Sequence, residues 1–450
     1  MRILIDQVVY DQRNIGNVAL LQTAVNRFSG LWPEATIEVL TEAPFSLRLY
    51  CPNVRPVSVF PSHNWSDQAG KNKKYLHELL PIQLIRILLE LRENNALHWS
   101  GPIINSLRRK LFDAREDSQP PVSATPEKIS RTETITSHLD SDLSQAVENA
   151  DILVASGGGY MVNTFNPGRL YTVLERLGQG IRMNKPTVMV GQGVHRLRNP
   201  ILVKKAKEVL PLIDYIFIRE KVLAPKVLSE LGVSPERVVM TGDDAVEMAY
   251  NARKPIWGHE IGVSLRVAIF TDVHIVDHIE TIRSVLHEVA NKYKSRLVAL
   301  PISHDREEMD VEYIRNLING YPNRSITWLK YESPLDIIKR IGHCRVVVTG
   351  AFHPAVFALS QGIPVVGIAK SRGYHAKFMG LADEFGAGCQ IIDLNGAELK
   401  EKLAYALSIA WENAEQFRPH LLEVAERQTR IGKNAYRQIY DLFNSRNNQH

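Results

Sequence analysis

The chain has 450 residues, 44% of them apolar and 23% charged, and a net charge of +5, so the sequence predicts a globular protein of two domains. The charge is too small to indicate nucleic acid as a partner. The three cysteines lie far apart and offer no zinc site, and no run of 18 uncharged apolar residues indicates a membrane span. We therefore expect a cytoplasmic protein without a metal or a cofactor.

The first elements read as strand, loop, helix and strand. An apolar strand is predicted over residues 2–9, a helix over 18–28 and a second strand over 37–40. Between the first two lies Asn14-Ile15-Gly16-Asn17. Gly16 permits an unusual backbone conformation there, and Asn17 is predicted to cap the helix. This order is typical of a doubly wound α/β domain.

Between residues 62 and 149 the alternation of predicted strands and helices is interrupted. Residues 78–93 form a helix that is apolar around most of its girth and flanked by lysines and arginines, whereas residues 113–134 are polar and rich in Pro and Ser. We predict a helical or disordered insertion whose helix packs on the first domain. The alternative is a peripheral membrane contact through 78–93.

Regular α/β alternation resumes at residue 151. A first domain is predicted over 1–250 and a second over 258–410, with C-terminal helices over 411–450 that cross back. Residues 345–370 form a complete strand–helix–strand unit, in which Val346 to Val348 lead into a helix that ends near Gly362. The predicted fold class is therefore α/β, with two doubly wound Rossmann-like domains that face a cleft, as in B-type glycosyltransferases.

Several strands end in residues that suit an anionic ligand. Because ligands bind at the carboxyl ends of strands in such sheets, the candidates gather in one region. They combine glycines, which let a ligand approach backbone N–H groups, with cations and imidazoles: Gly157, Gly158, Gly159, His195, Arg219, Arg266, His353 and Lys370. Simpler alternatives are a tight turn for the glycines, a salt bridge for Arg219 and a helix cap for His353.

The ordered motifs NIGN, DILVASGGGYM, GQGV, IFIRE, GDDA, GVSLR and VVVTGAFHPAVFALSQGIPVV resemble the polysaccharide pyruvyl transferase family. The resemblance spans about residues 1–388 apart from the insertion. It implies transfer of a pyruvyl group from phosphoenolpyruvate to sugar hydroxyls as a ketal. The acceptor would be a saccharide, often lipid-linked. Where the family has a basic residue, an apolar one and a histidine, this chain has Ala351, Phe352 and His353.

Under this hypothesis His353 protonates the donor, since the reaction needs an acid of near-neutral pKa. Arg219, Arg266 and Lys370 hold the phosphate and carboxylate. Asp305, with Asp243 as an alternative, orients the sugar hydroxyl. Asn14, Asn17 and His195 are assigned to the acceptor. Two alternatives stay open: a nucleotide-sugar glycosyltransferase, and a non-catalytic member acting in polysaccharide assembly, which Ala351 and Asn17 suggest.

Overall fold

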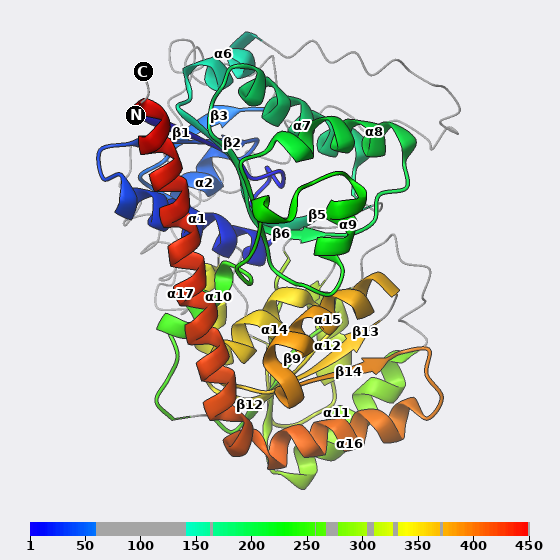
Figure 1. Ribbon diagram of the computed structural model, residues 1–450. Coiled ribbons are helices and arrows are strands. Elements are labelled where there is room, and N and C mark those ends of the chain that lie inside the picture. The colour runs from blue at the N-terminus through cyan, green and yellow to red at the C-terminus, as the bar shows by residue number, and fades with distance from the viewer. Residues whose placement is uncertain are drawn as a thin grey trace, which may run out of the picture. The chain divides into compact units, whose positions relative to one another are not determined.

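The computed structural model describes residues 1–59, 141–162, 165–256, 258–266, 278–303, 310–326, 332–369 and 372–448. Within these residues the chain forms two parallel β-sheets with helices between their strands (Figure 1). Both sheets belong to one compact unit, Met1–Val59 with Ser141–His450. The predicted insertion over 62–149 lies outside the described residues except for its last helix, α6 (Ser141–Asn149), and so does the predicted helix over 78–93.

The first sheet has eight strands among the described residues, in the order β3-β2-β1-β4-β6-β7-β8, with β5 beside β6. All eight residues of β6 are buried, as expected for a parallel strand covered on both faces. The strands are β1 (Arg2–Asp6), β2 (Thr36–Thr41), β3 (Arg55–Ser58), β4 (Ile152–Ala155), β5 (Gly158–Met161), β6 (Thr187–Val194), β7 (Tyr215–Ile218) and β8 (Val238–Met240). The helices are α1 (Ile15–Leu31), α2 (Pro44–Tyr50), α7 (Pro167–Arg182), α8 (Pro200–Val209), α9 (Ala224–Glu230) and α10 (Ala245–Asn251).

The second sheet has six strands in the order β11-β10-β9-β12-β13-β14, again within the described ranges. Its strands are β9 (Glu260–Ser264), β10 (Arg296–Ala299), β11 (Arg324–Ser325), β12 (Cys344–Thr349), β13 (Val365–Ala369) and β14 (Cys389–Asp393). Its helices are α11 (Ile279–Lys292), α12 (Asp310–Ile318), α13 (Pro334–Ile341), α14 (Phe352–Leu359) and α15 (Arg372–Phe385). Every residue of α14 after Phe352 is buried, which explains why this helix is apolar all round.

Two helices follow the second sheet. α16 (Leu399–Glu412) packs on α11, and α17 (Ala414–Asn447), red in Figure 1, packs on α1 and α10 of the first sheet. The Tyr436 hydroxyl donates to Asp244 Oδ2 at 2.9 Å, and its ring lies 4.9 Å from that of Phe28. The C-terminal helix therefore contacts elements of the first sheet, next to the loop that follows β8.

One prediction about local structure is wrong, and two of the simpler alternatives do not hold. Asn14, not Asn17, caps α1, because Asn14 Oδ1 accepts from the Asn17 N–H at 3.3 Å. The three glycines do not form a turn: Gly158 and Gly159 belong to β5, which pairs with β6. His353 does not cap α14, whose N-cap is Ala351 and has no side-chain bond.

The three cysteines are buried free thiols. Burial raises the pKa of both Cys51 and Cys389 to about 12, so both thiols stay protonated and unreactive. Within the described ranges, no helix combines the length and apolar character needed to cross a bilayer.

Candidate functional site

His353 stands at the carboxyl end of β12. Thr349 Oγ1 accepts from the Ala351 N–H at 2.9 Å and donates to the Ala351 carbonyl at 2.8 Å, and this turn directs the chain into α14. His353 follows as the second residue of the helix and is 8% exposed. Its Nε2 atom is buried without a hydrogen-bond partner and lies 4.0 Å from Asp243 Oδ2. A buried imidazole with an unused ring nitrogen is available for a ligand or a proton.

The imidazole lies directly against the first turn of α1. A Cβ atom built on Gly16 would come within 1.9 Å of His353 Nδ1 and 2.1 Å of its Cγ. Gly16 is a helical residue, and its φ is not among the positive values. The prediction that Gly16 provides an unusual backbone conformation is therefore wrong. The glycine is needed because any side chain would occupy the place of the His353 ring.

Arg219 extends from the end of β7 to the same region. Its Nη1 donates to Asp243 Oδ2 at 3.2 Å, and its guanidinium lies 4.2 Å from the centre of the Phe352 ring. Asp243 Oδ1 accepts from the Ala245 N–H at 3.0 Å. The neighbouring Glu220 instead accepts from two backbone N–H groups at the start of α9. Arg219 is thus held in place by a buried carboxylate and an aromatic ring.

Two glycines leave room for this guanidinium. A Cβ on Gly193 would lie 2.6 Å from Arg219 Nη2, and one on Gly159 would lie 3.1 Å from the same atom. The Gly159 position would also be 3.5 Å from Lys377 Nζ, which comes from α15. Lys377 was missed by the sequence analysis because no motif marks it. Its only signal is its place in the helix that follows β13, whose carboxyl end faces the ligand side.

Arg219, Phe352 and Lys377 border a small enclosed cavity of about 10 Å³ at the meeting of the two sheets, and His353 lies outside its lining. Its lining combines backbone, cationic and aromatic groups: Gly193, His195, Arg219, Glu220, Phe352, Lys377, Gly380 and Leu381. Both Arg219 and Lys377 bring positive charge to it, and the lining contains one carboxylate, Glu220, which is engaged by backbone N–H groups. The cavity therefore favours an anion.

Burial and the nearby cations keep the imidazoles neutral. Burial, and then the charges of Arg219, Arg266 and Lys377, hold the pKa of His353 well below its usual range. Burial, Lys377 and Arg219 lower the pKa of His195 to about 4. Burial raises the pKa of Asp243, although Arg219 opposes that effect. Both imidazoles are thus biased towards their neutral form, and a bound anion would raise their pKa values by offsetting the cations.

The family sequence profile of polysaccharide pyruvyl transferases matches residues 14–372, which include every site residue named above except Lys377, Gly380 and Leu381. The chain belongs to the polysaccharide pyruvyl transferase family. This confirms the resemblance seen in the motifs. Among curated proteins, none matches the chain significantly.

Solved structures identify the fold of this family member. UDP-GlcNAc 2-epimerase from Neisseria meningitidis, bound to UDP-GlcNAc, is 12% identical, with a TM-score of 0.56 over 98% of this chain and 100% of that one. The Methanocaldococcus jannaschii UDP-GlcNAc 2-epimerase is 12% identical, with a TM-score of 0.50 over 96% and 99%. A glycosyltransferase from Rickettsia africae is 11% identical, with a TM-score of 0.50 over 98% of both chains. The predicted fold, two parallel α/β sheets of the B-type glycosyltransferase kind, is confirmed.

In this pyruvyl transferase family member, five of the predicted residues gather at the site: Gly159, His195, Arg219, Arg266 and His353. Gly157 packs against the backbone of Gly191, since a Cβ there would be 2.9 Å from the Gly191 carbonyl oxygen. Gly158 lies beside Asn17, and the Asn14 side chain is used to cap α1. Asp305 and Lys370 are outside the described residues. No three His, Cys, Asp or Glu side chains in the described part of the chain are arranged to hold a metal.

Proposed function

We propose that the protein transfers a pyruvyl group from phosphoenolpyruvate to two hydroxyls of a saccharide, forming a cyclic ketal. The observation that carries this proposal is the group of cations, Arg219, Arg266 and Lys377, around the buried imidazole of His353. Phosphoenolpyruvate has a phosphate and a carboxylate on adjacent positions, so its site must supply several positive charges. The family of the chain supports the same donor and acceptor classes.

Arg219 and Lys377 are the proposed contacts of the donor's anionic groups. The Arg219 guanidinium is already fixed by Asp243 and Phe352, so it loses little conformational freedom when it binds. Arg266 follows β9 and supplies the third positive charge near His353, at the sheet edge where Ala351 replaces the family's usual basic residue. Arg219 comes from the first sheet, and Arg266 and Lys377 come from the second. Their positions are therefore consistent with a donor bound between the two sheets.

His353 is the proposed acid. In the reaction, the methylene carbon takes a proton and becomes a methyl group, while the first sugar oxygen bonds to the central carbon. The bond from this carbon to the phosphate oxygen then breaks, and the second sugar oxygen takes its place. Of the two hydroxyl protons, one replaces the proton that His353 delivers and the other leaves with the phosphate. Every atom of donor and acceptor is thereby accounted for.

This role requires a protonated His353, whereas burial and the three cations lower its pKa. The expectation that His353 has a near-neutral pKa is therefore wrong for this structure. We infer that the donor's own negative charges offset those of Arg219, Arg266 and Lys377 and so raise the pKa. Asp243, with Oδ2 4.0 Å from His353 Nε2, would stabilise the imidazolium once it forms. Asp305 remains the proposed group that orients the sugar hydroxyl.

The test is to measure phosphate release and ketal formation with phosphoenolpyruvate and a panel of saccharide acceptors. Calorimetric titration with phosphoenolpyruvate and with nucleotide sugars runs in parallel. The proposal expects phosphoenolpyruvate to bind and phosphate to appear only with an acceptor. Binding of a nucleotide sugar without binding of phosphoenolpyruvate would support a glycosyltransferase instead. A folded protein that binds neither donor would support the non-catalytic alternative.

A further inference from the structure

Two consecutive carboxylates in the loop after β8 have different partners. Asp243 accepts from Arg219 Nη1 at 3.2 Å and so belongs to the site described above. Asp244 accepts from the Tyr436 hydroxyl of α17 at 2.9 Å and from Arg27 Nη1 of α1 at 2.5 Å. The reaction proposed above uses Asp243 and Arg219 but gives no role to Arg27 or Tyr436.

Asp244 is a buried carboxylate that depends on these two donors. It is 3% exposed. Burial raises its pKa, whereas the charge of Arg27 and the hydrogen bond from Tyr436 lower it, and the neighbouring charge of Asp243 raises it. A buried carboxylate without such donors is strongly unfavourable, so it would take up a proton or turn towards another donor. The conformation of Asp244 therefore depends on Arg27 and Tyr436.

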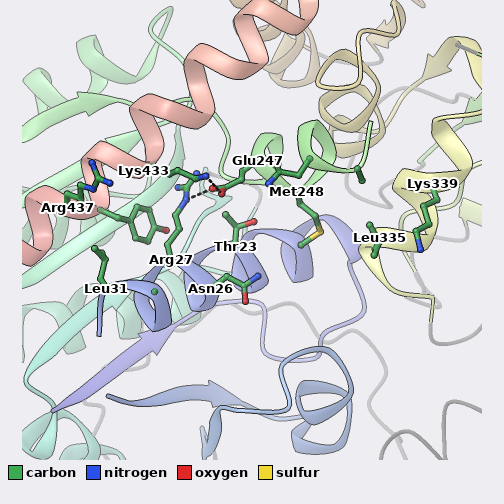
Figure 2. Close-up of a pocket in the computed structure, with 14 residues that line it drawn as sticks. Thr23, Asn26, Arg27, Leu31, Glu247, Met248, Leu335, Lys339, Lys433 and Arg437 are labelled. Atoms are coloured by element: carbon green, nitrogen blue, oxygen red, sulfur yellow. Dashed lines mark hydrogen bonds and ion pairs between the residues drawn. The ribbon is translucent and has the colours of Figure 1, made fainter. Parts of the chain in front are cut away.

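Arg27 is held in place by contacts with three helices. Its Nε donates to Glu247 Oε2 of α10 at 2.8 Å, and Lys433 Nζ of α17 lies 3.0 Å from Oε1 of the same carboxylate. Figure 2 shows both side chains directed at Glu247. A Cβ atom built on Gly432 of α17 would lie 2.7 Å from Arg27 Nη2. Arg27 is thus fixed between α1, α10 and α17, and from this position its Nη1 reaches Asp244.

The Tyr436 side chain makes two kinds of contact. Its ring centre lies 4.9 Å from that of Phe28 in α1 and 6.3 Å from that of Phe217 in β7. Its hydroxyl donates to Asp244. A phenylalanine at this position would keep the aromatic packing and lose only the hydrogen bond. The polar contact can therefore be tested without removing the packing of α17 on the first sheet.

The loop connects the position of Asp244 to that of Arg219 over a short path. Asp243 Oδ1 accepts from the Ala245 N–H at 3.0 Å, so the residues on either side of Asp244 are bonded to each other. Asp243 Oδ2 accepts from Arg219 Nη1. A change in the backbone at Asp244 would therefore displace the Asp243 carboxylate, and Arg219 with it.

α17 contacts the same loop at a second point. Gly242 has a φ of +79°, and a Cβ atom built on it would overlap with Gln428 Oε1. Gln428 Nε2 donates to Glu384 Oε2 of α15 at 3.2 Å, and α15 is the helix that carries Lys377. α17 therefore contacts both the loop that holds Arg219 and the helix that carries Lys377.

We propose that Arg27 and Tyr436 are positioning residues of the donor site: they fix Asp244, and thereby Asp243 and the donor contact Arg219. This role rests on the proposed function, in which Arg219 binds an anionic group of the donor. Tyr436 lies beyond the residues that the family profile matches, so the C-terminal helix contributes to the geometry of the donor site.

The first experiment removes the hydroxyl alone. Tyr436→Phe is compared with Tyr321→Phe, a matched control, because Tyr321 is 4% exposed and its hydroxyl donates to the Ser295 carbonyl at 3.0 Å, beside the second sheet. Calorimetry with phosphoenolpyruvate is expected to give a Kd at least ~5-fold higher for Tyr436→Phe, since small displacements of positioned groups are costly. The control should keep the Kd of the wild type, and the melting temperatures show that both variants are folded.

Arg27→Lys provides a second variant if Tyr436→Phe does not fold. The lysine keeps the positive charge but lacks the planar fork with which Arg27 reaches both Asp244 and Glu247. We expect the same direction of change in the Kd for phosphoenolpyruvate. An unchanged Kd in folded Arg27→Lys would count against the role of Arg27.

A double-mutant cycle separates positioning from a general loss of stability. If Tyr436 acts through Asp243, Tyr436→Phe has little further effect on the donor Kd in an Asp243→Asn background. Equal weakening of donor binding in the two backgrounds would show an effect that does not pass through Asp243, and it would overturn the role.

The titration of His195 provides a readout that needs no donor. His195 lines the same cavity as Arg219, Lys377 and Glu220, and burial, Lys377 and Arg219 lower its pKa to about 4. When Arg219 is no longer held in place, we expect the pKa of His195 to rise towards its ordinary value of 6.5. NMR of protein labelled in its histidine rings measures this pKa, and His195→Gln assigns the signal.

These measurements distinguish a failure of the positioning role from a failure of the proposed function. A wild-type protein that does not bind phosphoenolpyruvate contradicts the proposed function, and the titration of His195 then decides on the positioning role. A raised His195 pKa in Tyr436→Phe alone supports that role. An unchanged pKa in Tyr436→Phe overturns it, and so does a change of equal size in Tyr321→Phe.

Discussion

One added methyl group at Gly16 tests whether the position of His353 determines catalysis. In Gly16→Ala the new Cβ would lie 1.9 Å from His353 Nδ1, whereas non-bonded carbon contacts are about 3.5–4.0 Å. The imidazole must therefore move by roughly 1.5 Å to restore a normal contact. This movement changes the distance between His353 Nε2 and Asp243 Oδ2, which is 4.0 Å in the present structure. A displacement of about 1 Å can cost ~10²-fold in rate, so we expect kcat to fall by at least that factor. The KM for phosphoenolpyruvate should change little, because the three atoms nearest the new Cβ all belong to His353 and none to Arg219 or Lys377.

The stability of this variant is expected to change only modestly. Overpacking costs about 1–3 kcal/mol, and replacing a helical glycine by alanine returns about 0.5–1 kcal/mol. Gly30→Ala is the matched control in the same helix, since its Cβ meets no atom within 4 Å. It should raise the melting temperature and leave kcat unchanged.

The measurements are phosphate release under saturating donor and thermal unfolding. If Gly16→Ala does not fold, the double variant Gly16→Ala/His353→Ala should recover the lost melting temperature, because the ring that clashes is gone. A folded Gly16→Ala protein with the kcat of the wild type would refute the reasoning. It would mean that the imidazole can leave its present position without consequence for the chemistry.

Further predictions concern the charged and titrating groups. His353→Ala should lower kcat at least ~10²-fold with the fold intact, as expected for a general acid, and near-normal turnover would remove it from the mechanism. Arg266→Ala should raise the donor KM, by ~10-fold or more if it contributes about 1.5–3 kcal/mol to the charge-assisted contact, while the acceptor KM stays constant. Gly193→Ala should also raise the donor KM, because its Cβ would lie 2.6 Å from Arg219 Nη2; an unchanged KM would count against Arg219 as the donor contact. His195 has a pKa of about 4 when folded and about 6.5 when unfolded, so its neutral form stabilises the fold above pH 6.5 and this contribution is lost as the pH falls towards 4. Denaturant unfolding should show His195→Gln losing less stability than the wild type over that window, by up to about 1.4 kcal/mol per pH unit, and parallel pH profiles would contradict the assignment.

Much of the fold follows from local sequence pattern. The helix predicted over 18–28 and the strand predicted over 37–40 lie within α1 and β2 of the structure, because apolar periodicity marks both elements. The strand–helix–strand unit around His353 is also present as β12, α14 and β13. Its short connections force a parallel pair, so placing His353 at a carboxyl strand end needed no tertiary information.

The sequence by itself also determined the family and the cationic character of the site, since motif order and strand-end chemistry are properties of the chain alone. It could not assign Lys377, whose helix carries no motif, or the true role of Gly16. Both depend on residues far apart in the chain meeting in space: Gly16 touches His353, and Gly159 lies next to both Arg219 and Lys377. The pKa of His353 likewise depends on Arg219, Arg266 and burial. The local sequence pattern indicates which face of a helix or strand is apolar. Steric contacts and electrostatic interactions depend instead on distances between residues that are far apart in the chain, and only the tertiary structure sets those distances.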